Sequence, residues 1–144
     1  MSDLENDLQA LMPDMDVEID GENVTVREYR FKEGLQIAAK AKDFLNDLEH
    51  LFLQDDGQAV DEVDLIDLQS LFGTHEDLIT WLVSKSCDKS VEWVNGLSDS
   101  DGMALLNVWW TVNQPFFTRR LVQAALTRTV KKAAMLNYSK SLQH

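Results

Sequence analysis

The sequence predicts a mainly α protein: a small array of about five to six helices with an N-terminal β-hairpin. Apolar residues recur at three- and four-residue spacing along most of the chain from residue 32 onward. One early stretch instead alternates apolar and polar residues around an Asp-Gly pair. A chain of 144 residues suits one domain, and no repeat or second-domain boundary is evident. We therefore expect a lead at 1–15 and a single helical domain at 16–144, with the hairpin at 16–30 and helices across 32–140.

The lead and the hairpin follow from local signals. Ser2 and Glu5 have the spacing of a helix cap, and apolar residues recur up to Pro13, so residues 1–15 suit either a short helix or a flexible lead. In the next stretch, apolar residues alternate with acids on both sides of the turn Asp20-Gly21. Since a lone hairpin is marginally stable in water, it must pack on the helices or pair with another copy.

The first half of the helical region divides at clear breaks. The pattern predicts one long helix over residues 32–54, broken by the polar run at 55–58. A second helix follows from about residue 63 and ends at Gly73. Thr74 with Asp77 predicts the cap of a third helix, and a short helical segment near residues 91–94 stops at Gly96.

The stretch at 97–126 has the strongest local signals in the chain. Ser98 and Asp101 have the spacing of a reciprocal helix cap, so a helix should begin near Asp99. Proline lacks an N–H and disfavours helical geometry in the residue before it. We therefore expect this helix to end or kink near Asn113, and a second helix to run from Pro115 to about residue 138. The apolar face predicted for this second helix consists of Leu121, Ala125, Leu126, Val130, Ala133, Ala134 and Leu136.

Four aromatic residues lie close together in this stretch, as the pairs Trp109-Trp110 and Phe116-Phe117. Aromatic side chains bury roughly 150–250 Å² each, so the cluster could anchor most of a small core. Neighbouring residues on a helix point in different directions, however. The two pairs are therefore candidates for contact with a partner as well as for the core.

Charge is divided unevenly along the chain. The net charge is −12, yet all 25 acidic residues lie at or before Asp101, and only basic residues follow. This division indicates either pairing within the fold or a charged partner. A basic stripe on the last helix could bind an acidic protein surface or phosphates, although the negative total would repel nucleic acid unless the tail is well separated. The basic candidates for partner contact are Arg119, Arg120, Arg128, Lys131 and Lys132.

Residues that carry catalysis or bind metals are not recognisable. The single cysteine, Cys87, excludes an intramolecular disulfide and reads as a packing residue in a reduced compartment. None of the three histidines has ligand spacing with another, and the acidic runs after His75 and Asp99 suit first helical turns. We expect no enzyme activity, no cofactor and no metal.

Targeting signals are also missing from the pattern. No basic region followed by an apolar run opens the sequence, and no stretch reaches about 18 apolar residues. We therefore expect a soluble protein that is not exported and does not enter a membrane.

Three features together resemble the tail assembly chaperones of long-tailed bacteriophages, in particular those of Mu-like transposable phages and prophages. They are the hairpin sequence VEIDGENVTVREYRF, the stretch LSDSDGMALLNVWWTVNQPFFTRRL and the small size and acidity of the chain as a whole. The resemblance implies a non-enzymatic protein of the host cytoplasm that binds the helical tape-measure protein. It would keep that partner soluble, pass it to tail-tube subunits and self-associate. The alternative is a phage regulatory or nucleic-acid-associated protein that acts through the basic C-terminal helix.

Overall fold

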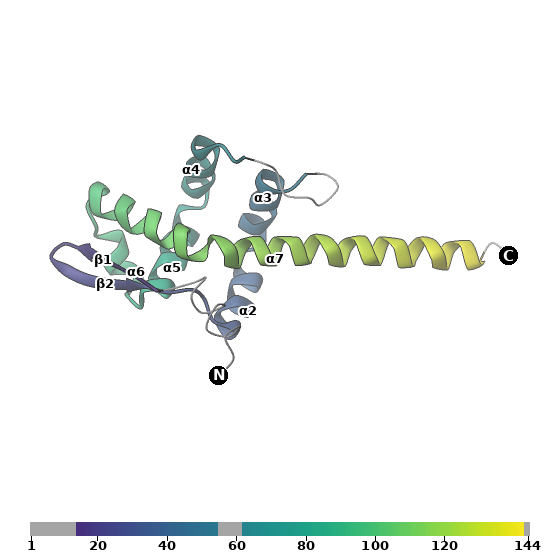
Figure 1. Cartoon of the computed structure of the whole chain (residues 1–144), viewed down its shortest axis with the longest axis horizontal. Coiled ribbons are helices and arrows are strands. Elements are labelled where there is room, and N and C mark those ends of the chain that lie inside the picture. The colour runs from purple at the N-terminus through teal and green to yellow at the C-terminus, as the bar shows by residue number, and fades with distance from the viewer. Residues whose placement is uncertain (1–13, 55–61, 143–144) are drawn as a thin grey trace, which may run out of the picture.

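The computed structural model describes residues 14–54 and 62–142 and confirms a mainly α fold with an N-terminal hairpin (Figure 1). The expectation of a short helix or flexible lead at 1–15 falls almost entirely outside the described residues, as does the break at 55–58. The elements in chain order are β1 (Met15–Ile19), β2 (Glu22–Val26), α2 (Phe31–Lys40), α3 (Lys42–Phe52), α4 (Leu65–Thr74), α5 (Glu76–Cys87), α6 (Val91–Asn95) and α7 (Asp99–Leu142).

The hairpin forms at the predicted turn. Asp20 and Gly21 both have positive φ, at 53° and 76°, which is the geometry that a two-residue hairpin turn of the I′ type requires. Val17 pairs with Val24 across the antiparallel strands. Ile19 is fully buried, and both strands contact α7, so the hairpin packs on the helices as a stable hairpin must.

A buried hydrogen-bond network fastens the segment after β2 to α5 and α7. The Asn113 side chain on α7 is fully buried; its Oδ1 accepts the Tyr29 N–H at 3.2 Å, and its Nδ2 donates to Ser86 Oγ at 3.0 Å. The Arg27 carbonyl accepts the Ser86 hydroxyl at 2.6 Å. Trp109 Nε1 donates to the Tyr29 hydroxyl at 2.8 Å. These bonds fix the hairpin against the two helices.

The predicted long helix at 32–54 is wrong in one respect, because the structure divides it into α2 and α3 at Ala41. Ala41 has φ −111° and ψ 30°, and its side chain is buried. No glycine or proline marks this point in the sequence. The break lets Ile37 on α2 and Phe44 on α3 both reach the core, so packing, not local propensity, sets it.

The predicted cap of α5 by Thr74 is also wrong. Thr74 is the last residue of α4, and its hydroxyl donates back to the Ser70 carbonyl at 3.0 Å. His75 stands at the N-cap of α5 without a side-chain capping bond. The other predicted boundaries nearby are confirmed, since α6 ends before Gly96 and the Asp101 N–H donates to Ser98 Oγ at 3.2 Å.

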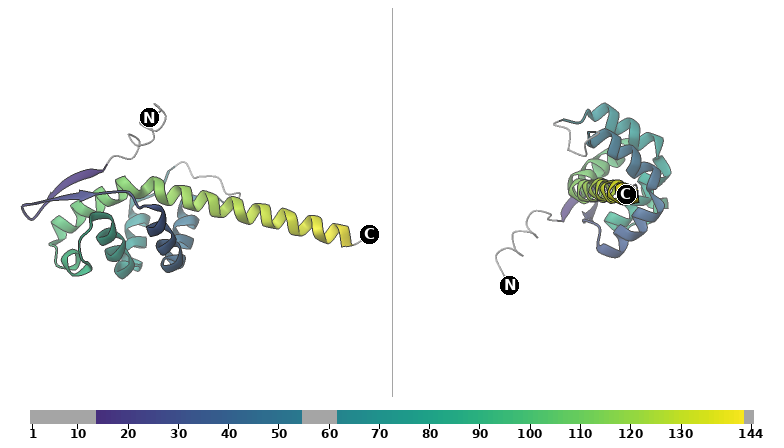
Figure 2. Two further views of the ribbon diagram at one scale, coloured as in Figure 1. Left: turned by 90° about the horizontal axis from the view of Figure 1, so that it is seen from below. Right: turned by 90° about the vertical axis from the view of Figure 1, so that its right-hand side faces the viewer.

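The expected end of a helix near Asn113 is not found, because α7 continues through Pro115. Its axis changes direction in the green part of the helix instead (Figure 2, left). A proline inside a helix costs about 3 kcal/mol or more, mainly through the lost bond to the carbonyl four residues earlier. Trp109 and Val112 before Pro115, and Phe117 after it, are buried. Burying each such side chain stabilises the fold by roughly 1.5–3 kcal/mol, so together they outweigh that cost.

The C-terminal part of α7, residues 126–142, is called the arm below. The first half of α7 crosses the layer of helices α2 to α6, while the arm extends well beyond them (Figures 1 and 2). Every arm residue is exposed, and the helix reaches Leu142, past the predicted end at 138. The predicted apolar face packs on the core as far as Ala125 and no further, because beyond Arg128, which pairs with Glu49 of α3, no helix of the described residues lies beside the arm.

Candidate functional site

Three of the four predicted aromatic partner contacts lie in the core of the single chain. Trp109 is 0%, Phe116 5% and Phe117 1% exposed. The Trp109 ring lies edge-on to Phe72 and Phe117, with centroids 5.6 and 5.8 Å apart. Such edge-to-face pairs add roughly 0.5–1.5 kcal/mol each beyond area burial. The structure therefore gives these three residues a packing role and leaves them no surface for a partner.

Trp110 is the exception, because its side chain is half-buried at the edge of the core. Its ring stacks on Phe117 with a centroid distance of 5.9 Å and an interplanar angle of 22°. Phe72 and Phe52 also contact it, at 5.5 and 5.8 Å. The remaining side of the indole faces a groove, so Trp110 is held in place by the core while it stays accessible.

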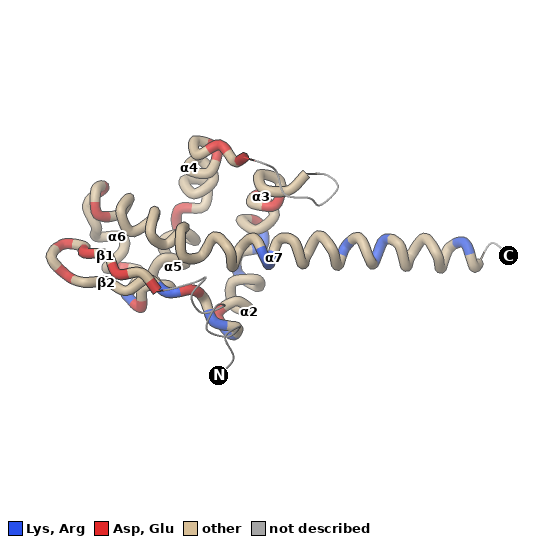
Figure 3. The backbone as a smooth tube through the Cα atoms, in the orientation of Figure 1, with Lys and Arg blue, Asp and Glu red and all other residues tan. Residues whose placement is uncertain are grey.

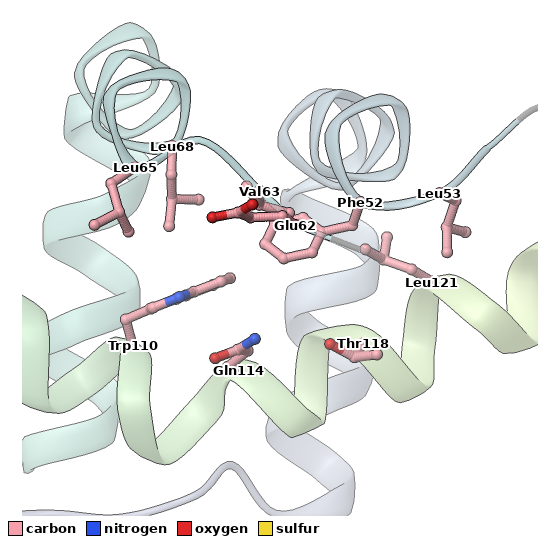
Figure 4. Close-up of a pocket in the computed structure, with 10 residues that line it drawn as sticks. All are labelled: Phe52, Leu53, Glu62, Val63, Leu65, Leu68, Trp110, Gln114, Thr118 and Leu121. Carbon is pink, nitrogen blue, oxygen red and sulfur yellow. The ribbon is translucent and has the colours of Figure 1, made fainter. Parts of the chain in front are cut away.

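This groove lies between α3, α4 and α7 and has a volume of about 430 Å³ (Figure 4). From α7, Trp110, Gln114 and Thr118 point toward Leu68 of α4 and Phe52 of α3. The lining is mostly apolar, with a few polar groups that could orient a bound chain. Its lining residues are Phe52, Leu53, Glu62, Val63, Leu65, Leu68, Trp110, Gln114, Thr118 and Leu121.

The start of α4 adds exposed apolar and acidic side chains to the groove. Leu65 lines it and is 71% exposed, and the neighbouring Ile66 is 72% exposed. Glu62 also lines the groove, and Asp64, between the lining residues Val63 and Leu65, is exposed. Asp64 caps α4 by accepting the Ile66 N–H at 2.8 Å, and Asp67 lies in its first turn. A segment with an apolar stripe and flanking cations would match both features.

The three arginines predicted to contact a partner are used largely within the chain. Arg119 pairs with Glu28, and Arg128 pairs with Glu49. The Arg120 guanidinium lies over the Phe116 ring, 5.5 Å from its centroid, beside Gly34 of α2. A Cβ at Gly34 would lie 3.2 Å from Phe116 Cε2 and closer still to Arg120, so the glycine makes room for this contact.

The two predicted lysines remain on the arm. Lys131 and Lys132 are exposed, and no ion pair involves them within 14–54 and 62–142. Acidic residues are spread over the described chain before residue 126, called the body below, whereas the charged residues of the arm are all basic (Figure 3). The charge division therefore has both explanations offered by the sequence: α7 pairs with the body through Arg119 and Arg128, and Lys131 and Lys132 further along the arm form no ion pair among the described residues.

Outside the groove, Arg27 forms a cluster of ion pairs that stabilises the fold. Arg27 donates to both Glu33 oxygens at 2.7 and 2.8 Å, and also to Asp88. Its guanidinium lowers the pKa of Glu33 to about 2 and lowers the pKa of Asp88. Desolvation by burial raises the pKa of Cys87, which favours the unreactive thiol. These groups stabilise the junction of hairpin, α2 and α5.

The described part of the chain has no group of three or more His, Cys, Asp or Glu side chains placed to hold a metal ion. None of its helices is both long and apolar enough to cross a membrane. His75 Nε2 lies 2.8 Å from Asp47 Oδ2, but its ring packs edge-on to Phe44, 5.4 Å between centroids. We assign that pair to the junction of α3 with α5.

Sequence reasoning identified Trp110 but not the rest of the groove. The predicted second helix, from about residue 63 to Gly73, includes Leu65 and Ile66, but the pattern does not predict that these two side chains are exposed. Adjacent apolar residues directly after acids at a helix start were the available signal. Gln114 and Thr118 carried no signal, because their role depends on which side of α7 faces α3 and α4.

No curated protein and no solved structure matches this chain. Residues 7–143 match the model of a family of unknown function, DUF6631, and the chain therefore belongs to the DUF6631 family.

Proposed function

We propose that this protein is a non-enzymatic tail assembly chaperone of a long-tailed bacteriophage. It binds the helical tape-measure protein in the host cytoplasm, keeps it soluble and promotes assembly of tail-tube subunits around it. The observation that carries the proposal is the apolar groove with an acidic rim, set on a strongly acidic body. The sequence resemblance to tail assembly chaperones also implies a role in virion morphogenesis and self-association of the chain.

The groove suits an amphipathic helix of a partner. Trp110 forms its aromatic wall and is supported from behind by Phe117 and Phe72. A rigid aromatic side chain in such a position is typical of a binding hot spot. Covering Leu65, which lines the groove and is 71% exposed, would add roughly 1.5–3 kcal/mol if the side chain becomes fully buried. The binding energy thus comes from apolar burial that a long apolar helix can supply.

The charge of the body suits a solubilising role. Residues 1–101 carry a formal charge of −18. Once an apolar helix is covered, mutual repulsion between such bodies opposes aggregation of the complexes. An acidic surface around the groove also selects partners with basic flanks over acidic ones.

Co-expression with the tape-measure protein from the same gene neighbourhood tests the proposal. We expect the partner to become soluble only in a complex that co-elutes with this chain on size exclusion. Trp110→Ala should abolish co-elution or weaken binding about 30-fold, since a hot-spot tryptophan contributes about 2 kcal/mol or more. Phe31→Ala is the matched control, because Phe31 is 69% exposed on α2, outside the groove lining.

The result that contradicts the proposal is a partner that stays insoluble beside a folded, soluble chain. Equal losses from Trp110→Ala and Phe31→Ala would also count against the groove.

One observation favours a second candidate, a nucleic-acid-associated regulatory protein. Beyond Arg128, which pairs with Glu49, the arm extends away from the acidic body and carries cations without acids (Figure 3). Duplex DNA binding that falls steeply between about 50 and 200 mM salt would support this function. No binding at the lower salt concentration would remove it.

A further inference from the structure

The arm combines exposed apolar side chains with cations in a regular pattern. Met135, Tyr138 and Leu142 recur at spacings of three and four residues, which places them on one face of the helix. They are 67%, 64% and 68% exposed. Lys131 precedes Met135 by four residues and continues the same face, with Lys132 beside it. The arm is thus an apolar helical stripe with basic residues at its start.

That pattern fits a protein surface better than nucleic acid. Phosphate binding needs cations along the contact face, whereas three of the four positions in this stripe are large and apolar. Two arms side by side are disfavoured too, because residues 126–142 contain Arg128, Lys131, Lys132 and Lys140 and no acid. The occupant that suits the arm is an apolar groove with an acidic rim.

The groove between α3, α4 and α7 has those properties. Its lining is mainly apolar and includes Glu62, and the exposed Asp64 lies between the lining residues Val63 and Leu65. The arm cannot reach it within the same chain. Trp110 and Leu121 line the groove from α7 itself, and the helix continues unbroken from them to Leu142, away from the body (Figure 1). Folding the arm back would break the helix, so the complementary charges must meet between chains.

We infer that the arm of one copy docks in the groove of a second copy. The apolar stripe lies against Trp110 and Leu68, and Lys131 and Lys132 approach Glu62 and Asp64. The contact joins two different surfaces, so it closes as a reciprocal pair or a ring, or continues as a chain of copies. It builds on the proposed function, of which self-association is part, by naming the surfaces that meet. A tape-measure helix then competes with the arm for the groove.

Sedimentation velocity on the purified chain alone tests the inference, without any partner protein. We expect the mean mass to rise at least twofold between about 1 and 300 µM, because an interface of one helix is smaller than the standard of about 800 Å² per partner and should be weak. Removal of residues 130–144 should leave a monomer throughout. That truncation keeps Arg128, which pairs with Glu49, and removes only exposed residues among those described.

Charge exchange identifies the contact. Lys131→Glu with Lys132→Glu should lower self-association at least tenfold, and adding Glu62→Lys in the same chain should restore part of it. Lys32→Glu with Lys42→Glu makes the same change in net charge on exposed lysines outside the groove and should have little effect. Restoration excludes a simple loss of folding as the cause.

Three results would overturn the inference: a wild-type monomer at every concentration, self-association that survives the truncation, or equal losses from the arm and control pairs. A wild-type monomer that binds duplex DNA with steep salt dependence would assign the arm to nucleic acid instead. A monomer that still solubilises the tape-measure protein would reject arm docking and leave the proposed function intact.

Discussion

Replacing Asn113 by alanine should loosen the hairpin from the helices. The side chain is fully buried, and its oxygen is the acceptor for the Tyr29 N–H. Its amide also donates to Ser86 Oγ and to the Arg27 carbonyl, at 3.0 and 3.3 Å. Leaving one buried donor unpaired costs about 1–3 kcal/mol, and each net hydrogen bond lost adds roughly 0.5–1.5 kcal/mol. We therefore expect the free energy of unfolding to fall by about 2–4 kcal/mol.

Urea unfolding followed by circular dichroism measures this loss, and a thermal scan should show a decrease in Tm of about 6–15 °C for a domain of this size. Asn107→Ala is the control, because Asn107 is an exposed asparagine on the same helix and should change stability by less than about 0.5 kcal/mol. If Asn113→Ala is as stable as Asn107→Ala, the network does not hold the hairpin and our account of the junction is refuted.

Three further predictions concern acid, Pro115 and the arm. Arg27 depresses the pKa of Glu33 from 4.5 to about 2, so this pair stabilises the fold fully above pH 4.5 and loses its effect as pH falls toward 2. Solvent screening limits the loss to about 1–3 kcal/mol, and Glu33→Gln should flatten stability against pH in that window; an unchanged slope would contradict the assignment. Pro115→Ala restores an N–H for the Thr111 carbonyl and should raise the free energy of unfolding by about 1–3 kcal/mol in urea titrations; a decrease would mean that the proline fits the bend better than a regular helix does. Removal of residues 130–144 should change stability by less than about 0.5 kcal/mol, whereas a larger loss would place the arm in the fold of the monomer.

Local signals in the sequence predicted the elements well where a single residue pair decides the geometry. Asp20-Gly21 forms the hairpin turn, and Ser98 caps α7. Both depend on backbone preferences that act over a few residues. The division between α2 and α3 at Ala41 has no such signal, because it follows from where Ile37 and Phe44 pack.

Pro115 shows the limit of a local rule. The rule for proline predicts an end or a kink; α7 does not end there, because core contacts on both sides keep it in one piece, and its axis bends instead (Figure 2). The helix therefore continues to Leu142 and carries the arm out of the body (Figure 1). Tertiary packing thus created the exposed arm, for which helical periodicity alone predicted a continued apolar face.

The candidate site was predictable only in part. The aromatic pairs were correctly identified as a cluster, but periodicity cannot tell which of two neighbours is covered. Trp109 bonds to Tyr29 and is fully buried, whereas Trp110 lines the groove between α3, α4 and α7. The groove itself depends on three helices meeting, and its residues are separated by up to 69 positions between Phe52 and Leu121.

The most direct test of the central claim is a photo-cross-linking measurement on the complex with the tape-measure protein. A photoreactive amino acid at Gln114, inside the groove, should cross-link to the partner. The same residue at Asn107, exposed on α7 outside the groove, should not. Cross-linking from position 107 alone, or from neither position in a complex that stays intact, would contradict binding in the groove.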